Sequence, residues 1–334
     1  YYKGGKPDLQ LFDKKLYEVN PDDKVAIARA AAEEVLGKDE RIISVDSSYS
    51  DGEGSSYRLI SNGFEGESKS TWFSVSASVS IKGEGEARPQ DYWYDSALFY
   101  DKLTKAGIGA KALERVLRKL GQKKAKSGKY TMVVDPMNVG NLLSPMLSAL
   151  YGSALQQKNS FLMDKLDTKV ASDLFTLRDE PHAIGANGSR YFDNEGVATE
   201  PRTVFDKGVL KTYFIDTYNG KKMDIAPTIS APSRLILTPG DKDLNGLVAD
   251  IKQGILVTGF NGGNSNSSTG DFSYGIEGFL IEDGKLTQPV NEMNVTGNMV
   301  TLWNSLVAVG NDPQPNRSWQ IPSLVFEGVD FSGL

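Results

Sequence analysis

The segment Asp135–Gly152, with the sequence DPMNVGNLLSPMLSALYG, decides how the second half of the chain folds. It follows Lys129–Val134 (KYTMVV), a short apolar run with β-branched residues, so we expect a strand that leads directly into a helix. Asp135 is suited to cap this helix, and Pro136 fits its first position, where a missing N–H carries no penalty. Gly152 is the expected end of the helix.

Apolar residues recur through this segment at helical spacing, and the pattern predicts one buried helix face. Its members are Val139, Leu142, Leu143, Met146, Leu147 and Leu150. Pro145 cannot donate a hydrogen bond to the carbonyl of Asn141, so we expect the helix either to kink at Pro145 or to restart with Ser144 as an N-cap. Taken alone, this face is that of an ordinary core helix.

The chain contains one histidine and no cysteine. A zinc site in a protease needs two histidines and a third ligand such as Glu or Cys, so His182 has too few partners and is assigned no chemistry. A serine nucleophile at Ser144 or Ser148 would need an activating base within hydrogen-bond reach. Both hydroxyls are more simply explained as capping or solvated groups. The composition therefore argues against metalloprotease and serine-hydrolase chemistry in this chain.

From about Asp46 to its end, the chain resembles the TldD/PmbA family, the proposed modulators of DNA gyrase. The resemblance is carried by ordered blocks at consistent spacing: NGFEG at Asn62–Gly66, GSRYFDNEG at Gly188–Gly196, TGDFS at Thr269–Ser273 and VGND at Val309–Asp312. The catalytic branch of this family is metallopeptidase-like and carries His-Glu-x-x-x-His after a Leu-Leu pair on the helix that Asp135–Gly152 predicts.

Alignment on Leu142-Leu143 places Ser144 at the first His position, Pro145 at the Glu position and Ala149 at the second His position. No metal ligand or general base remains, and no catalytic residue is assigned. The resemblance is thus to the PmbA (TldE) branch, which lacks the motif and ends in a segment similar to IPSLVFEG at Ile321–Gly328. It implies no cofactor in this chain and zinc only in a catalytic partner subunit.

Composition narrows the class of protein. The 334 residues, 24% of them charged, are typical of a soluble globular protein, and the net charge of −6 disfavours general binding to nucleic acid. The basic run Leu113–Lys129 is expected to be a solvated helix end and a linker. No apolar run reaches eighteen residues, so we expect no membrane span. The first residues lack the apolar core of a signal peptide, and the resemblance implies a cytoplasmic protein.

The first part of the chain alternates between helical and strand-like patterns. Asn20-Pro21 starts a helix that runs to about Leu36 and buries Val25, Ala28, Ala32, Val35 and Leu36. A second helix is expected over Ile108–Leu120. Between them, period-two patterns predict a three-stranded antiparallel meander with turns at Gly52–Gly54 and Asn62-Gly63. The aromatic run Ala87–Tyr100 either lines a cleft or packs under a loop.

The second part of the chain is richer in strands. Hairpins are expected over Thr203–Phe214, with Gly208 in the turn, and around Asp283-Gly284. A strand at Gly254–Phe260 precedes a Gly/Asn/Ser-rich loop, and a last helix is expected over Val295–Val309.

These patterns and the resemblance together predict an α+β fold with two domains. Residues 1–125 form a mixed N-terminal domain with an antiparallel meander, and residues 126–334 form a β-rich domain with a central helix. Family members carry a segment upstream of the position that matches Leu9, so the N-terminal domain can be a partial one.

The family blocks supply the candidate cleft residues Arg190, Asp193, Thr269, Asp271 and Ser273, with Arg190 and Asp193 as a candidate ion pair. The resemblance implies a homodimer or a heterodimer with a TldD-like subunit that acts on small or unfolded peptides. We therefore expect a non-catalytic subunit that lines the substrate cleft. The alternative is a self-assembled peptide-binding module that pairs peptide with a strand edge near Gly259–Gly278.

Overall fold

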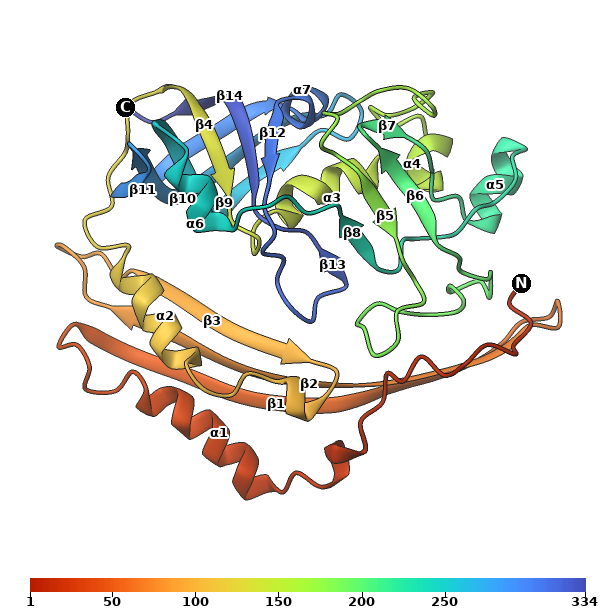
Figure 1. Cartoon of the computed structure of the whole chain (residues 1–334), viewed down its shortest axis with the longest axis horizontal. Coiled ribbons are helices and arrows are strands. Elements are labelled where there is room, and N and C mark those ends of the chain that lie inside the picture. The colour runs from red at the N-terminus through yellow and green to blue at the C-terminus, as the bar shows by residue number, and fades with distance from the viewer.

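The computed structural model describes every residue from 1 to 334, and its first half is built on a three-stranded antiparallel sheet of order β1-β2-β3. The strands are β1 (Ile42–Leu59), β2 (Glu65–Ile81) and β3 (Gln90–Ala97). Figure 1 shows this long, curved sheet beneath the rest of the molecule, with α1 (Pro21–Glu33) on its outer side. The short 3-10 turns η1 (Lys14–Tyr17) and η2 (Tyr100–Lys102) flank it.

The apolar face of β2 carries the smaller hydrophobic core. Alternate residues of this strand, from Phe73 to Ile81, are at most 1% exposed, as the period-two pattern predicts. They pack against α1 and against α2 (Ile108–Leu117). The opposite face of β2 is rich in serine and faces the second half of the chain.

Two sequence predictions about this sheet are wrong. The expected turn at Gly52–Gly54 is the middle of β1, because Gly52 lies opposite Trp72 and a Cβ there would come within 3.0 Å of the indole ring. The glycine makes room for an aromatic side chain on the neighbouring strand and does not mark a turn. The third strand, β3, comes instead from the aromatic run that we expected to line a cleft or lie under a loop.

The buried face of α1 also differs from the prediction. Val25 and Leu36 are 55% and 58% exposed, whereas Ala31 and Val35 are fully buried. The reason is the close approach of α2, since a Cβ on Gly109 would lie 1.9 Å from the carbonyl oxygen of Ala31. This contact between small residues turns the Ala31 side of the helix inward.

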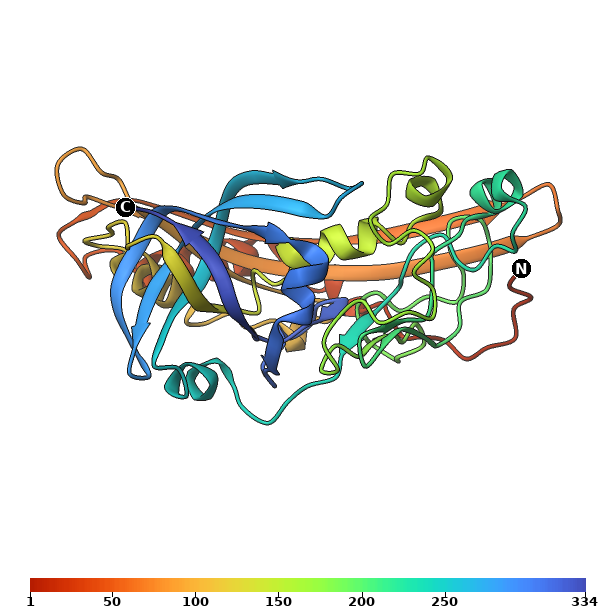
Figure 2. The ribbon, with the colours of Figure 1, turned by 90° about the horizontal axis from the view of Figure 1, so that it is seen from above.

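A six-stranded sheet of order β11-β10-β9-β4-β14-β12 forms the main layer of the second half. β4 (Gly128–Val134) pairs in parallel with β9 (Gln253–Ser265) and antiparallel with β14 (Leu324–Ser332). The remaining strands are β10 (Asp271–Glu282), β11 (Lys285–Asn298) and β12 (Leu306–Val309). β11 also pairs with β14, so the sheet curls back on itself (Figure 2).

Short strands and helices complete the second half. A five-stranded sheet of order β13-β8-β5-β6-β7 comprises β5 (Leu177–Asp179), β6 (Arg202–Asp206), β7 (Val209–Leu210), β8 (Leu235–Leu237) and β13 (Trp319–Gln320). The helices are α3 (Gly140–Ser148), α4 (Gly152–Gln156), α5 (Thr217–Met223), α6 (Leu244–Ala249) and α7 (Met299–Asn304). None of the helices combines the length and the apolar character that a membrane crossing requires.

The central helix α3 follows β4 and buries the predicted face. Val139, Leu142, Leu143, Met146 and Leu150 are all inaccessible, and they belong to a core of 39 buried residues. The helix begins at Gly140, four residues later than expected, because the Asp135 carboxylate accepts the Asn138 backbone N–H in a separate turn. It is continuous through Pro145, so no restart occurs at Ser144, and Gly152 begins α4.

The last predicted helix, Val295–Val309, is mostly strand. β11 continues to Asn298, whose side chain caps the six-residue α7, and Leu306–Val309 pairs with β14 as β12. The two hairpins around Gly208 and around Asp283-Gly284 are confirmed. The α+β fold class is confirmed, and the division of the chain at residue 125 stays a prediction.

Candidate functional site

The three positions that align with the His-Glu-x-x-x-His motif do not face one common cavity. Ser144 is exposed, Pro145 is half-buried and Ala149 is 1% exposed within the core. A hydroxyl, a pyrrolidine ring and a methyl group offer neither an imidazole nor a carboxylate to a metal ion. The donor set at this position therefore does not fit zinc, and no cluster of three or more His, Asp or Glu side chains is close enough to hold a metal elsewhere.

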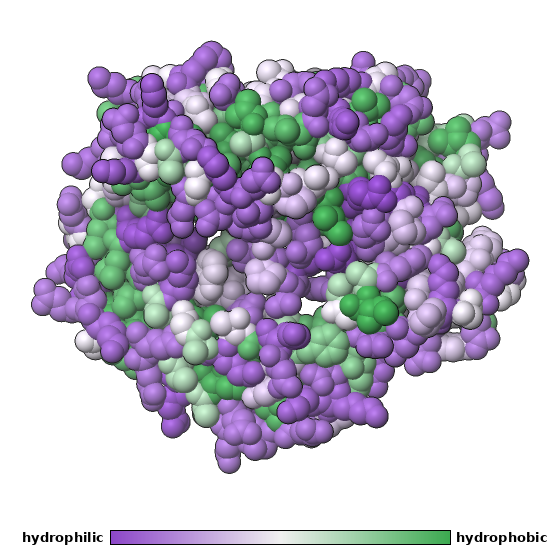
Figure 3. All heavy atoms as spheres, viewed as in Figure 1, coloured by the Kyte–Doolittle hydropathy of each residue, from purple (hydrophilic) through white to green (hydrophobic).

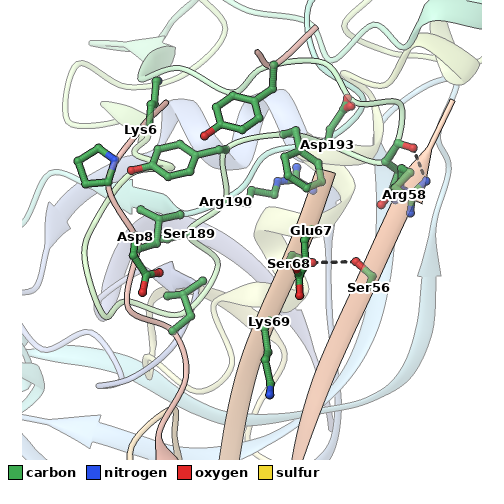
Figure 4. Close-up of a pocket in the computed structure, with 17 residues that line it drawn as sticks. Lys6, Asp8, Ser56, Arg58, Glu67, Ser68, Lys69, Ser189, Arg190 and Asp193 are labelled. Atoms are coloured by element: carbon green, nitrogen blue, oxygen red, sulfur yellow. Dashed lines mark hydrogen bonds between the residues drawn. The ribbon is translucent and has the colours of Figure 1, made fainter. Parts of the chain in front are cut away.

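A groove separates the serine-rich face of the first sheet from the loops of the second half, and Figure 3 shows the molecule hollowed there. One cavity in it, of about 340 Å³, lies between the far end of the β1–β2 hairpin and the loop 189–194. Figure 4 shows Ser56, Arg58 and Ser68 on the strands and Arg190 and Asp193 on the loop side. The structure thus brings two of the five predicted cleft residues to one cavity.

Arg190 and Asp193 do not form the ion pair that we expected. The Arg190 guanidinium donates to the Ser233 hydroxyl at 2.8 Å and to the Ala231 carbonyl at 2.7 Å. The Asp193 carboxylate accepts backbone N–H groups, including that of Ser230 at 2.9 Å. Both side chains therefore clamp the segment 230–233 to the loop, and burial lowers the pKa of Arg190.

Thr269, Asp271 and Ser273 lie elsewhere, on the exposed end of the β9–β10 hairpin. Asp271 accepts hydrogen bonds from Asn298 and Thr269, and these bonds lower its pKa. None of the three residues lines a cavity of the groove. The hairpin has one free edge, because β9 pairs with β4 only over residues 254–257.

The histidine and the two candidate serine nucleophiles do not form a hydrogen bond with one another. His182 shares a hydrogen bond with Thr199 at 3.0 Å and packs on the Tyr191 ring, and burial lowers the pKa of its imidazole. Ser144 and Ser148 are exposed on α3 and make no side-chain hydrogen bond to a base. The serine-hydrolase reading gains no geometric support.

Sequence inspection missed three cations that meet in the groove: Lys102, Arg234 and Arg317 line a second cavity of about 480 Å³. A third cavity, of about 350 Å³, lies between the first two and shares Arg190 with one and Asn187 with the other. The three cations are far apart in sequence and belong to no motif, so only the fold brings them together.

The groove continues, past Arg317, into a smaller cavity beside the start of α3. Arg317 lies over the Tyr94 ring at 4.6 Å, at the boundary with this cavity. Nearby, Asp135 is 5% exposed, and burial raises the pKa of its carboxyl to about 6. The groove therefore runs from the β1–β2 hairpin to the N-terminal end of α3.

The sequence matches two family models along almost its whole length. Residues 14–120 match the PmbA/TldA metallopeptidase central domain, and residues 127–333 match the PmbA/TldA metallopeptidase C-terminal domain. The metalloprotease PmbA homologue of Haemophilus influenzae is 30% identical over 98% of this chain and 73% of its own length. The metalloprotease PmbA of Escherichia coli is 28% identical over the same shares of the two chains.

Solved structures agree with these matches. A proposed modulator of DNA gyrase from Bacteroides thetaiotaomicron is 73% identical, with a TM-score of 0.99 over 100% of this chain and 76% of that one. A second such protein, from Thermotoga maritima, is 26% identical, with a TM-score of 0.90 over 99% of this chain and 79% of that one. TldE of Thermococcus kodakarensis, 22% identical over 99% of this chain and 78% of that one, shares the fold with a TM-score of 0.82.

Proposed function

This chain belongs to the PmbA/TldD metallopeptidase family, and we propose that it is a non-catalytic subunit of a TldD/PmbA-type peptidase complex. The observation that carries the proposal is the state of the motif positions on α3. Ser144 is exposed, Ala149 is buried, and neither side chain can bind zinc or act as a base. Peptide hydrolysis in such a complex would be performed by a TldD-like partner.

The contribution of this chain is to line the peptide cleft. The groove offers a long, continuous surface with both charged and apolar lining, which suits an extended polypeptide better than a compact small molecule. Arg190 and Asp193 hold one wall rigid by clamping the segment 230–233. We assign the complex to the cytoplasm from the family resemblance, and any effect on DNA gyrase would be indirect.

The test is reconstitution. The purified chain, a purified TldD-family protein that retains the His-Glu-x-x-x-His motif, and their mixture are each assayed for zinc content and for cleavage of unfolded peptides. We expect a stable complex, zinc only in the partner, and cleavage that this chain alone does not perform. Stoichiometric zinc together with hydrolysis by this chain alone would refute the proposal. This outcome has to be tested because both of the PmbA relatives above bear the name metalloprotease.

The free edge of β9 favours a second candidate, a self-assembled peptide-binding module. Residues 259–265 of this strand pair only with β10, so their outer backbone groups are available to an added strand, whereas the Thr258 carbonyl already accepts from the Asn138 side chain. A homodimer that binds peptide and ignores the TldD-family protein in the same mixing experiment would favour this candidate over the first.

A further inference from the structure

The middle of the groove holds a cavity whose charged lining is entirely basic. Its volume is about 480 Å³, and Lys102, Arg234 and Arg317 are its charged residues. No Asp or Glu side chain lines it, although the whole chain carries a net charge of −6. Lys102 comes from the first half of the chain and the two arginines from the second, so the site exists only when both halves are in place.

The two arginines lack the partners that buried cations normally have. Neither forms an ion pair within the chain, and the Nε of Arg234 is buried with no hydrogen-bond acceptor. Glu180, whose negative charge acts on the Arg234 guanidinium, is itself engaged by Arg178 at 2.7 Å. Burial lowers the pKa of both guanidinium groups, since part of their hydration is lost without replacement.

Both arginines are held in place before any ligand arrives. The backbone N–H of Arg234 donates to the Asp179 carboxylate at 2.8 Å, and its carbonyl accepts from the Glu180 N–H at 2.8 Å. The Arg317 guanidinium rests on the Tyr94 ring at 4.6 Å. A preorganised site loses less conformational entropy when it binds its ligand.

We propose that this cavity binds the carboxylate of a peptide, with Arg234 and Arg317 as the principal donors and Lys102 as a third positive charge. Guanidinium groups match carboxylates with paired, charge-assisted hydrogen bonds. The apolar residues Leu98 and Phe99 line the same cavity and suit an apolar side chain next to that carboxylate. The choice of a peptide, among carboxylate ligands, rests on the function proposed above.

The neighbouring cavities give such a peptide a path. The cationic cavity shares Leu98, Ala186 and Asn187 with the cavity of about 350 Å³, which in turn shares Ser189 and Arg190 with the one beneath the β1–β2 hairpin. A peptide anchored by its carboxylate can therefore extend along the groove toward the hairpin.

Calorimetric titration of the whole chain, without any partner, tests the proposal. The ligands are the tripeptide Ala-Ala-Phe with a free C-terminus, the same peptide as a C-terminal amide, an amidated peptide with an internal aspartate, and inorganic phosphate. The proteins are the natural chain, Arg317→Gln, Arg234→Gln and, as a charge-matched control, Lys38→Gln, since Lys38 is exposed and outside the groove. Circular dichroism spectra establish that each variant is folded.

We expect the free-acid peptide to bind and each arginine variant to weaken binding about tenfold or more, while Lys38→Gln leaves it unchanged. If neither amidated peptide binds, the cavity recognises the C-terminal carboxylate of the peptide. If the amidated aspartate peptide binds, the cavity recognises a side-chain carboxylate. Equal binding of the plain amide, or binding of phosphate alone, would overturn the proposal. Because no partner is present, failure here leaves the reconstitution result untouched.

Discussion

The Lys119 ammonium, in the turn after α2, lies 2.8 Å from the Glu277 carboxylate of β10, and this ion pair joins the two halves of the molecule. Both side chains are largely buried, at 11% and 19% exposure. Lys119 also contacts the Asp91 carboxylate at 3.2 Å, which Arg115 approaches at the same distance. Two cations and two carboxylates thus form one network that joins β3 and the end of α2 to β10.

Replacement of Lys119 should therefore destabilise the protein far more than replacement of an exposed lysine. Lys119→Met leaves Glu277 without a cation and Asp91 with one, and we expect a loss of about 2–4 kcal/mol in the free energy of unfolding. Lys111→Met, on the neighbouring helix α2, is the control, because the Lys111–Glu114 pair is exposed and should contribute under about 0.5 kcal/mol. Urea denaturation of both variants measures the difference, and equal losses would contradict the role of the network.

The buried carboxyl of Asp135 gives a prediction about pH. Its pKa in the folded protein, about 6, lies above the ordinary value of 3.8, because burial disfavours the charged form. Between these values the folded protein binds a proton that the unfolded chain releases, so this group stabilises the fold at low pH and loses that effect as the pH rises through 6. The difference between pH 4 and pH 7 is about 2 kcal/mol.

Asp135→Asn should remove this dependence. The amide keeps an oxygen for the Asn138 backbone N–H and side-chain Nδ2–H groups, which donate to Asp135 at 3.0 and 2.6 Å. The free energy of unfolding, measured by urea titration at several pH values, should favour the variant increasingly as the pH rises from 4 to 7. Parallel profiles for the two proteins would mean that Asp135 does not titrate in this range.

Gly188, in the family block beside the groove, should resist substitution for two separable reasons. Its φ is +87°, and a Cβ would lie 2.6 Å from the Ser233 carbonyl oxygen, in the segment that Arg190 clamps. Gly188→Ala is expected to cost about 3 kcal/mol or more. Gly121→Ala is the matched control, since Gly121 has φ +74° and open space around its Cα, so it should cost only the 1–2 kcal/mol of the left-handed backbone, about half as much. Thermal denaturation of the two variants separates clash from backbone strain.

Sequence periodicity predicted correctly those elements whose structure depends on a local repeat and not on contacts with distant parts of the chain. The apolar face of α3 and the alternation in β2 were correct, because their burial follows from a local repeat. Gly52 misled the prediction, since no local signal distinguishes a turn glycine from one that lies under Trp72 on the next strand. The segment Leu306–Val309 looks helical by itself, and its pairing with β14 decides otherwise.

The candidate site was predictable only where a motif marked it. The family blocks led to Arg190 and Asp193, and these two residues do line the groove, although each binds backbone groups and not the other. Thr269, Asp271 and Ser273 came from an equally clear block and lie on a hairpin away from it. The basic cavity was not predicted, because Lys102, Arg234 and Arg317 are brought together only by long-range packing.

The last prediction concerns the positions that align with the metal motif. Introducing His, Glu and His at these positions should not restore a metal site. Ser144 is exposed, so Ser144→His should change the free energy of unfolding by less than about 0.5 kcal/mol. Ala149 is 1% exposed beside the Ser160 hydroxyl, which donates to its carbonyl at 2.6 Å. An imidazole there must displace core side chains and lose its water, so Ala149→His should cost about 3 kcal/mol or more.

The two single variants control for the triple variant Ser144→His, Pro145→Glu, Ala149→His, because they separate the loss of folding from the loss of metal binding. Thermal denaturation ranks their stability, and zinc content after dialysis measures the site. We expect the triple variant to be destabilised as much as Ala149→His and to retain no stoichiometric zinc. Tight zinc binding by a folded triple variant would mean that the helix can present both positions to one cavity, and that only side chains, and not the backbone, separate this chain from a catalytic subunit.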